Sequence, residues 1–143
     1  MELPPITVKN SGYVVLDKII DERDGNLCVI EESKTVPFDI RRVYYINHLE
    51  NCVSLRGQHA HKHLEQVIFS INGSFTLHLD DGVNTQDLHL YKDNIGIYLG
   101  TYLWHTMSNF SSGCILLCLA SDYFNEDDYI RDYNKFLEHV KND

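Results

Sequence analysis

Short runs rich in β-branched and aromatic residues recur along the chain, and turn-forming residues separate them. The turn signals are Asp24-Gly25-Asn26, Pro37, Asn72-Gly73, Asp81-Gly82, Gly96, Gly100 and Ser111-Ser112-Gly113. The runs of strand length are Leu27–Ile30, Arg42–Ile46, Gln66–Ile71, Ser74–Leu79, Gly96–Leu99 and Cys114–Ala120. Many short strands at such intervals are typical of a β-sandwich or β-barrel, so the pattern predicts an all-β protein.

The clearest local signal is the Asn72-Gly73 pair between the runs Gln66–Ile71 and Ser74–Leu79. An Asn-Gly pair supplies the positive φ angles that a two-residue hairpin turn requires, so we predict an antiparallel hairpin here. In the second run the apolar side chains alternate with polar ones, which predicts one packed face and one solvent-facing face. The packed face consists of Phe75, Leu77 and Leu79.

The period of the pattern changes near the C-terminal end. Apolar residues recur there at three- and four-residue spacing, at Tyr129, Ile130, Tyr133, Phe136, Leu137 and Val140. This spacing predicts an amphipathic helix, and Asn125 is placed to cap its start. No linker, repeat or low-complexity tract interrupts the chain. We therefore expect residues 1–143 to form a single domain, a β-barrel with a C-terminal α-helix.

Composition narrows the class of protein. The 143 residues are 43% hydrophobic and 23% charged, which suits one folded domain with a sizeable core. The formal net charge is −9, so no long-range field attracts nucleic acid. No run approaches the roughly 20 apolar residues that cross a bilayer, and we see no signal peptide. The four cysteines form no CxxC pair, and we interpret them as reduced thiols of a cytoplasmic protein.

One segment carries most of the candidate chemistry, Arg56-Gly57-Gln58-His59-Ala60-His61-Lys62-His63-Leu64-Glu65-Gln66. In an extended strand His59 and His61 point to the same face, and Glu65 joins them if the strand continues. A further histidine, His105, follows Trp104 later in the chain. Together they resemble the two cupin motifs, HxHxxxE followed by a distant His. Metal cupins bind one transition-metal ion with three histidines and a carboxylate, so a metal site is one interpretation. Chance occurrence of exposed strand histidines is another.

Longer strings resemble the dTDP-sugar 3,4-ketoisomerases over nearly the whole chain. These strings are Pro37-Phe38-Asp39-Ile40-Arg41-Arg42-Val43-Tyr44-Tyr45-Ile46, Arg56-Gly57-Gln58-His59-Ala60-His61, Leu119-Ala120-Ser121-Asp122-Tyr123-Phe124 and Asp128-Tyr129-Ile130-Arg131-Asp132-Tyr133. The resemblance implies a cupin, or jelly-roll, barrel that works without a metal or other cofactor. It also implies a homodimer with exchanged N-terminal strands. The implied reaction converts dTDP-4-keto-6-deoxyglucose to a 3-keto isomer in bacterial deoxysugar pathways, such as those for lipopolysaccharide or S-layer glycans.

The residues suit that chemistry. Moving a carbonyl from C4 to C3 requires removal of the C3 proton, an enediol, and return of a proton to C4. By the resemblance His59 is the base and His61 its partner, and an ordinary imidazole pKa of about 6.5 suits proton transfer at neutral pH. Arg42 and Arg56 are candidates for binding the diphosphate, because guanidinium groups bind phosphate as forks. Tyr44 shares a strand face with Arg42, so we expect Tyr44 rather than its neighbour Tyr45 to line the cavity.

The resemblance extends to the stereochemistry of the product. Two positions differ between the product types of the family, the residue after the Trp and a residue in the early turn. Here they are His105 and Arg23, a combination that resembles the galacto-forming group. This implies dTDP-3-keto-6-deoxygalactose, with His105 holding a proton at neutral pH and delivering it to C4. Three alternatives stay open: a metal-dependent cupin such as a dioxygenase, a dTDP-sugar 3,5-epimerase, and a cupin that binds a ligand without catalysis.

Overall fold

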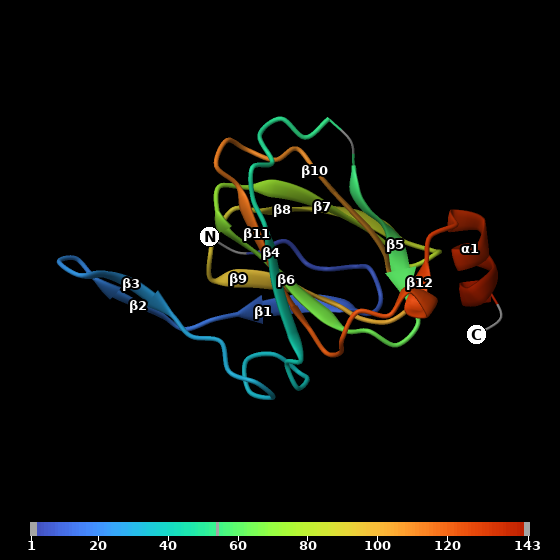
Figure 1. The fold of residues 1–143 in the computed structure, drawn as a ribbon, viewed down its shortest axis with the longest axis horizontal. Coiled ribbons are helices and arrows are strands. Elements are labelled where there is room, and N and C mark those ends of the chain that lie inside the picture. The colour runs from blue at the N-terminus through green and yellow to red at the C-terminus, as the bar shows by residue number, and fades with distance from the viewer. Residues whose placement is uncertain (1–2, 54, 142–143) are drawn as a thin grey trace.

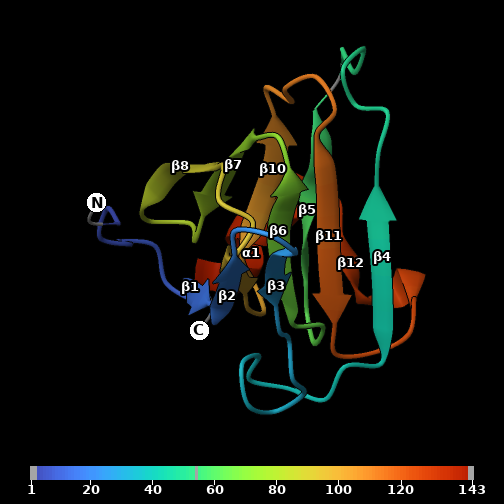
Figure 2. The ribbon, with the colours of Figure 1, turned by 90° about the vertical axis from the view of Figure 1, so that its left-hand side faces the viewer.

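The computed structural model describes residues 3–53 and 55–141 and consists mainly of two facing five-stranded β-sheets (Figure 1, Figure 2). The first sheet has the order β1 (Ser11–Val15), β9 (Ile95–Leu99), β6 (Gln66–Asn72), β11 (Ile115–Ala120) and β4 (Arg42–Ile46). The second has the order β12 (Tyr129–Ile130), β5 (Arg56–His61), β10 (Trp104–Ser108), β7 (Phe75–Asp80) and β8 (Thr85–Leu90). Neighbouring strands run antiparallel throughout.

The main core fills the space between the two sheets. Phe75, Leu77 and Leu79 of β7 are completely buried, which confirms the predicted packed face of that strand. A second apolar cluster lies on the other face of the first sheet, where Phe38 packs with Val67 and neighbouring residues. Both faces of β6 are therefore covered, one by the main core between the sheets and the other by this second cluster.

The Asn72-Gly73 turn does not form the predicted hairpin. β6 pairs with β9 and β11, whereas β7 pairs with β8 and β10, so the turn is a corner between the sheets. Only Gly73 of the pair has a positive φ, 69°, while the expected turn type needs positive φ at both positions. The Ser70 hydroxyl donates to the Gly73 carbonyl at 2.8 Å, and the Ser74 N–H donates to Ser111 Oγ at 2.8 Å. These contacts fix the corner, so the hairpin prediction was wrong although both strands form.

The predicted C-terminal helix is shorter than its apolar pattern. Asn125 Oδ1 accepts from the Asp127 N–H at 3.1 Å and caps a short 3-10 helix, η1 (Glu126–Asp128). The next two residues form β12, which pairs with the edge strand β5, because that edge offers backbone partners. The α-helix α1 begins only at Tyr133 and ends at Lys141. Across residues 3–53 and 55–141, we find no helix long and apolar enough to cross a membrane.

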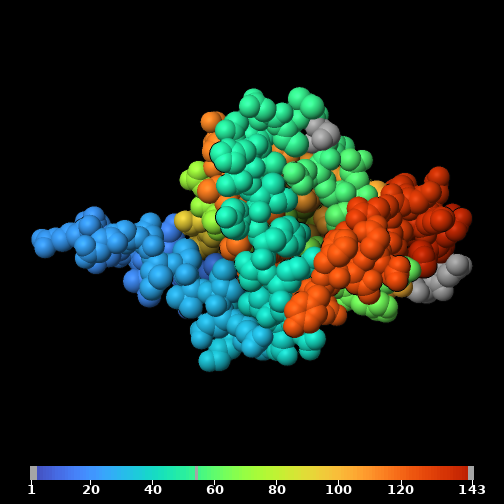
Figure 3. Space-filling model, viewed as in Figure 1, coloured from blue at the N-terminus to red at the C-terminus, as the bar shows by residue number. Residues whose placement is uncertain are grey.

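A two-stranded hairpin projects from the barrel. It consists of β2 (Lys18–Asp21) and β3 (Gly25–Cys28), and it extends to the left in Figure 1. The side chains of Ile19, Ile20 and Leu27 on it are 58%, 68% and 57% exposed. An apolar arm of this kind buries little surface in its own chain, as its isolation in Figure 3 shows.

Candidate active site

A β-bulge in β5 sets the position of the first histidine. Gly57 and Gln58 both have positive φ, 82° and 58°, and the register with β10 shifts so that His59 pairs with His105 and Gly57 with Thr106. Gln58 is therefore the extra residue of the bulge. A side chain at position 57 would put its Cβ 2.8 Å from the His105 carbonyl oxygen, so glycine is required there.

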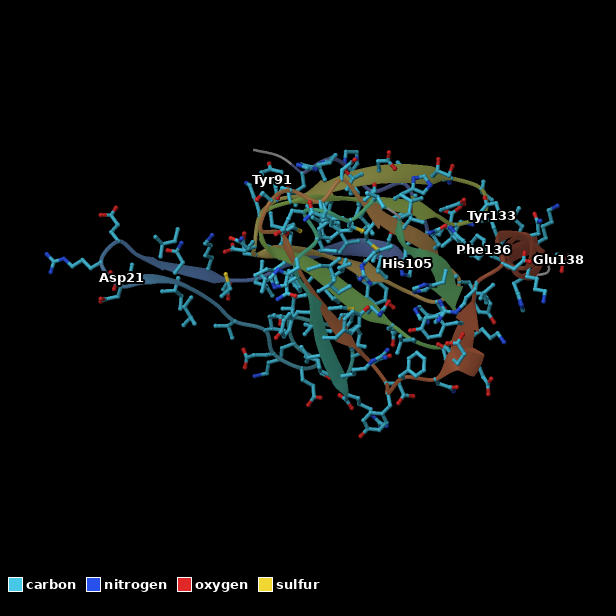
Figure 4. All side chains as sticks on the ribbon, turned by 45° about the horizontal axis from the view of Figure 1, so that its top comes forward. Asp21, Tyr91, His105, Tyr133, Phe136 and Glu138 are labelled. Carbon is cyan, nitrogen blue, oxygen red and sulfur yellow. The ribbon has the colours of Figure 1, made fainter. Side chains whose placement is uncertain are left out.

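Three imidazoles meet inside the barrel at this point. The ring centroid of His59 lies 4.8 Å from that of His61 and 4.8 Å from that of His105. The Tyr129 ring of β12 covers the cluster at 4.8 Å from His59 and 4.4 Å from His61. Figure 4 shows His105 in the interior, far from Asp21 on the projecting hairpin. The cluster joins strands that are remote in sequence.

A cavity of about 280 Å³ opens onto this cluster. Five residues predicted from the sequence line it: Arg42, Tyr44, Arg56, His59 and His105. Tyr45 is 66% exposed on the opposite face of β4, as the strand parity predicted. His61 is only 2% exposed and lies behind His59 rather than on the cavity wall.

Backbone acceptors fix the tautomers of the two cavity histidines. Nδ1 of His59 lies 3.0 Å from the Gly57 carbonyl oxygen, and Nδ1 of His105 lies 3.1 Å from the Leu103 carbonyl oxygen. A carbonyl only accepts hydrogen bonds, so each Nδ1 carries the proton. The Nε2 atom of each ring is then left with a free lone pair, which is the atom a general base uses.

Burial keeps all three imidazoles uncharged. Desolvation, followed by the neighbouring His61, lowers the pKa of His59 to about 4. Desolvation, followed by electrostatic interactions with His105, Arg42 and Arg131, lowers the pKa of His61 to about 3. Desolvation and His59 lower the pKa of His105 to about 3. The ordinary pKa expected from the sequence does not apply, and the expectation that His105 holds a proton at neutral pH is wrong for the unliganded protein.

These shifts predict how stability depends on pH. Between about pH 6.5 and pH 4 these three histidines are protonated in the unfolded chain but stay neutral in the folded protein. Their contribution to the free energy of unfolding therefore falls as the pH is lowered. We expect urea unfolding midpoints to fall across this window, and His61→Asn to reduce the fall. His89→Asn, on an exposed position of β8, is the matched control. An unchanged pH dependence in His61→Asn would contradict this account.

Arg42 supplies positive charge at the wall. Its guanidinium carbon lies 5.6 Å from the Tyr44 ring centroid and 5.9 Å from that of Phe124. Its buried Nε makes no hydrogen bond within the described residues, so this donor is available to a ligand. Tyr44 Oη accepts from Gln66 Nε2 at 3.1 Å, and burial raises the pKa of Tyr44. The phenol therefore stays protonated, and its O–H is directed at the Cys118 sulfur in the unliganded protein.

Glu65 does not complete a metal site. The Tyr98 hydroxyl donates to Glu65 Oε1 at 2.5 Å. Among the residues that the structure describes, the group with ligand atoms close enough for one ion is His59, His61 and His105, within 4.8 Å of one another. The Glu65 carboxylate, which the metal interpretation needs as a fourth ligand, is thus hydrogen-bonded to Tyr98 and lies outside this group.

Besides His61, one predicted site residue does not line the cavity, and that residue is Arg23. It lies in the turn between β2 and β3, where its N–H donates to Asp21 Oδ1 at 2.9 Å. Three further residues line the cavity although the sequence did not predict them as site residues: Tyr129, Gln66 and Cys118. Tyr129 belongs to one of the strings that resemble the ketoisomerases, but its spacing predicted a helix. The local sequence does not indicate that β12 pairs with β5.

The match to known proteins decides the family. The family model described as "FdtA: WxcM-like, C-terminal" matches residues 9–141. The chain belongs to the FdtA family. The TDP-4-oxo-6-deoxy-alpha-D-glucose-3,4-oxoisomerase of Aneurinibacillus thermoaerophilus is 49% identical to this chain over 123 residues, which cover 86% of this chain and 87% of that protein.

Solved structures agree with this FdtA-family assignment. A double mutant of the QdtA 3,4-ketoisomerase from Thermoanaerobacterium thermosaccharolyticum, in complex with TDP, has a TM-score of 0.91 at 38% identity and covers 95% of this chain and 97% of its own. The rmlC epimerase of Mycobacterium tuberculosis has a TM-score of 0.72 at 16% identity, covering 90% and 72%. The second likeness is one of fold alone, and it confirms the cupin jelly roll with a C-terminal helix.

Proposed function

We propose that this FdtA-family chain is a 3,4-ketoisomerase that converts dTDP-4-keto-6-deoxyglucose to a dTDP-3-keto-6-deoxy sugar. The observation that carries the proposal is the pair His59 and His105, two neutral imidazoles with ring centroids 4.8 Å apart on one cavity wall. Arg42 and Arg56 on the same wall suit a diphosphate. The names of the relatives support the substrate class.

The reaction uses the chain's own groups. Nε2 of His59 removes the C3 proton, the C3–H electron pair forms the enediolate double bond, and the C4 carbonyl oxygen becomes an oxyanion. Return of that proton to C4 and transfer of the C3 hydroxyl proton to the C4 oxygen then leave a carbonyl at C3 and a hydroxyl at C4. The Tyr44 phenol is a donor for the developing oxyanion, because it lines the cavity and stays protonated.

The direct test is incubation of the purified protein with dTDP-4-keto-6-deoxyglucose, followed by NMR of the product. We expect a C3 carbonyl, formed at an unchanged rate in excess chelator, because enolisation needs acid, base and oxyanion support. Loss of turnover on chelation, restored by one added metal, would favour the metal-dependent alternative. Inversion at C5 would favour the epimerase, and binding of dTDP without turnover would favour a non-catalytic cupin.

We further propose a homodimer in which the β2–β3 hairpins are exchanged. The exposed apolar side chains of Ile20 and Leu27 favour burial against a second copy. The first sheet also ends at β4, whose Val43 and Tyr45 are exposed. A hairpin placed there by the partner would cover both and bring Arg23 toward the cavity.

A prediction follows for the oligomer. Ile20→Asp combined with Leu27→Asp should convert the protein to a monomer in analytical ultracentrifugation, because buried charges are costly at an apolar interface. Val83→Asp is the control, since Val83 is also exposed but lies in the β7–β8 turn. A dimer that persists in the double variant contradicts hairpin exchange.

Complementation tests the origin of Arg23. Suppose Arg23→Ala and His59→Asn each impair turnover as homodimers. With exchanged hairpins, a mixed dimer has one intact site, so mixing the two variants should restore activity. No restoration after subunit exchange would place Arg23 outside the partner's site.

We also propose a cytoplasmic location and a role in supplying deoxysugars for lipopolysaccharide or S-layer glycans. Cys114 and Cys118 are buried thiols that form no disulfide, the state that the cytosol maintains. Detection of the protein in the periplasmic fraction of its cells would contradict the location. Unaltered glycan composition in a deletion strain would contradict the role.

A further inference from the structure

A buried carboxylate, Asp128, has no part in the scheme above. It ends η1 and directly precedes β12, in the string that the sequence analysis used only for the resemblance. Its side chain is 10% exposed. Carboxylates are seldom buried unless a partner compensates the lost hydration, so the position of Asp128 requires an explanation.

The backbone after β5 holds this carboxylate in place. Asp128 Oδ1 accepts from the His63 N–H at 2.8 Å, and Oδ2 accepts from the Leu64 N–H at 3.0 Å. The Asp128 carbonyl in turn accepts from the Lys62 N–H at 3.1 Å. These three bonds fix both carboxylate oxygens relative to the end of the histidine strand.

The same carboxylate faces a catalytic histidine. Oδ2 lies 3.5 Å from Nδ1 of His61, whose side chain is 3% exposed. Neither ring nitrogen of His61 has a hydrogen-bond partner within the described residues. A buried polar atom without a partner costs free energy, so a small approach of Nδ1–H to Oδ2 would be favourable. His59 and His105 face neutral carbonyls instead, so among the described contacts of the three rings only His61 lies within 4 Å of a carboxylate.

We propose that Asp128 is a positioning residue that holds His61 with Nδ1 protonated toward its carboxylate and Nε2 toward the imidazole cluster. The proposal rests on the ketoisomerase function. When the cluster takes a proton from C3, a positive charge on His61 is opposed by Arg42 and Arg131 and favoured by Asp128. The carboxylate thereby makes His61 the group that holds the proton between its removal and its return, as in other carboxylate–histidine pairs.

The tautomer of His61 gives a test that needs no turnover. Long-range ¹H–¹⁵N spectra of the wild-type protein should show His61 with its proton on Nδ1. A proton on Nε2 in the wild-type protein overturns the proposal, whether or not the protein isomerises any sugar. A wild-type protein with the expected tautomer but no turnover would overturn the ketoisomerase function instead.

Kinetics give the second test. Asp128→Asn removes the charge and offers an amide N–H to Nδ1, which favours the wrong tautomer. We expect kcat to fall by about 10²-fold or more, with KM for the sugar nucleotide almost unchanged. Ser121→Ala is the matched control, because Ser121 Oγ accepts from the Glu65 N–H at 2.9 Å and anchors the same loop without contacting His61.

The two variants separate positioning from loop stability. A large loss of kcat in Asp128→Asn, with nearly normal kcat in Ser121→Ala and an altered His61 tautomer, supports the proposal. A kcat within about threefold of wild type in Asp128→Asn, or an equal loss in both variants, overturns it. If Asp128→Asn does not fold, the wild-type spectrum alone decides.

Discussion

His59→Asn is expected to abolish isomerisation while leaving the fold and dTDP binding nearly intact. Asparagine keeps a polar side chain of similar reach but cannot accept a proton from carbon. A general base contributes about 10²–10⁴-fold, so turnover should fall by that factor. Product formation is measured by NMR, and dTDP affinity by calorimetry.

The same segment provides a matched control. His63 is two residues beyond His61, but its side chain does not line the 280 Å³ cavity. His63→Asn should therefore keep normal turnover. Retention of more than about a tenth of wild-type turnover in His59→Asn would remove His59 as the base. His61→Asn should be about as harmful as His59→Asn, because its imidazole is the nearest partner of His59 on β5.

The local elements that the sequence predicted best are those buried on at least one face. The run Arg42–Ile46 coincides with β4, because its exposed and half-buried residues alternate. The run Cys114–Ala120 differs from β11 by one residue, because it is apolar throughout. The strands β8 and β10 were missed because polar side chains interrupt their patterns. The Asn72-Gly73 corner was misread because its partners, such as Ser111, are remote in sequence.

The sequence predicted which residue types form the site, but not which of them line the cavity and which lie behind its wall. Strand parity put His59 and His61 on one face, yet the register of β5 against β10 leaves only His59 on the cavity wall. Tyr129 fitted a helical period, and the sequence carries no sign that Asp128 and Tyr129 meet the end of β5. The lowered imidazole pKa values come from burial, which depends on the assembled barrel.

His105→Gln is expected to separate the two halves of the reaction. The histidine cluster is uncharged before substrate binds. The proton removed from C3 is therefore the one that the cluster can give back to C4. We expect His105, 4.8 Å from His59, to return that proton to C4 after His61 has held it. In D₂O the variant should still exchange the C3 hydrogen through His59, whereas product formation should fall by about 10²–10⁴-fold. Loss of C3 exchange together with product formation would instead place His105 in the first step.

The same proton path predicts the label and stereochemistry of the wild-type product. Substrate deuterated at C3 and turned over in H₂O should carry part of its deuterium at C4, because His61 and His105 are buried from bulk water and His59 is only partly exposed. Delivery from His105 should leave the C4 hydroxyl axial, as in dTDP-3-keto-6-deoxygalactose, and the coupling between H4 and H5 reports this directly. An equatorial C4 hydroxyl contradicts the galacto assignment, and complete loss of deuterium to solvent contradicts transfer within the cluster. If both fail while the C3 carbonyl still forms, the group that donates the proton to C4 lies outside the cluster.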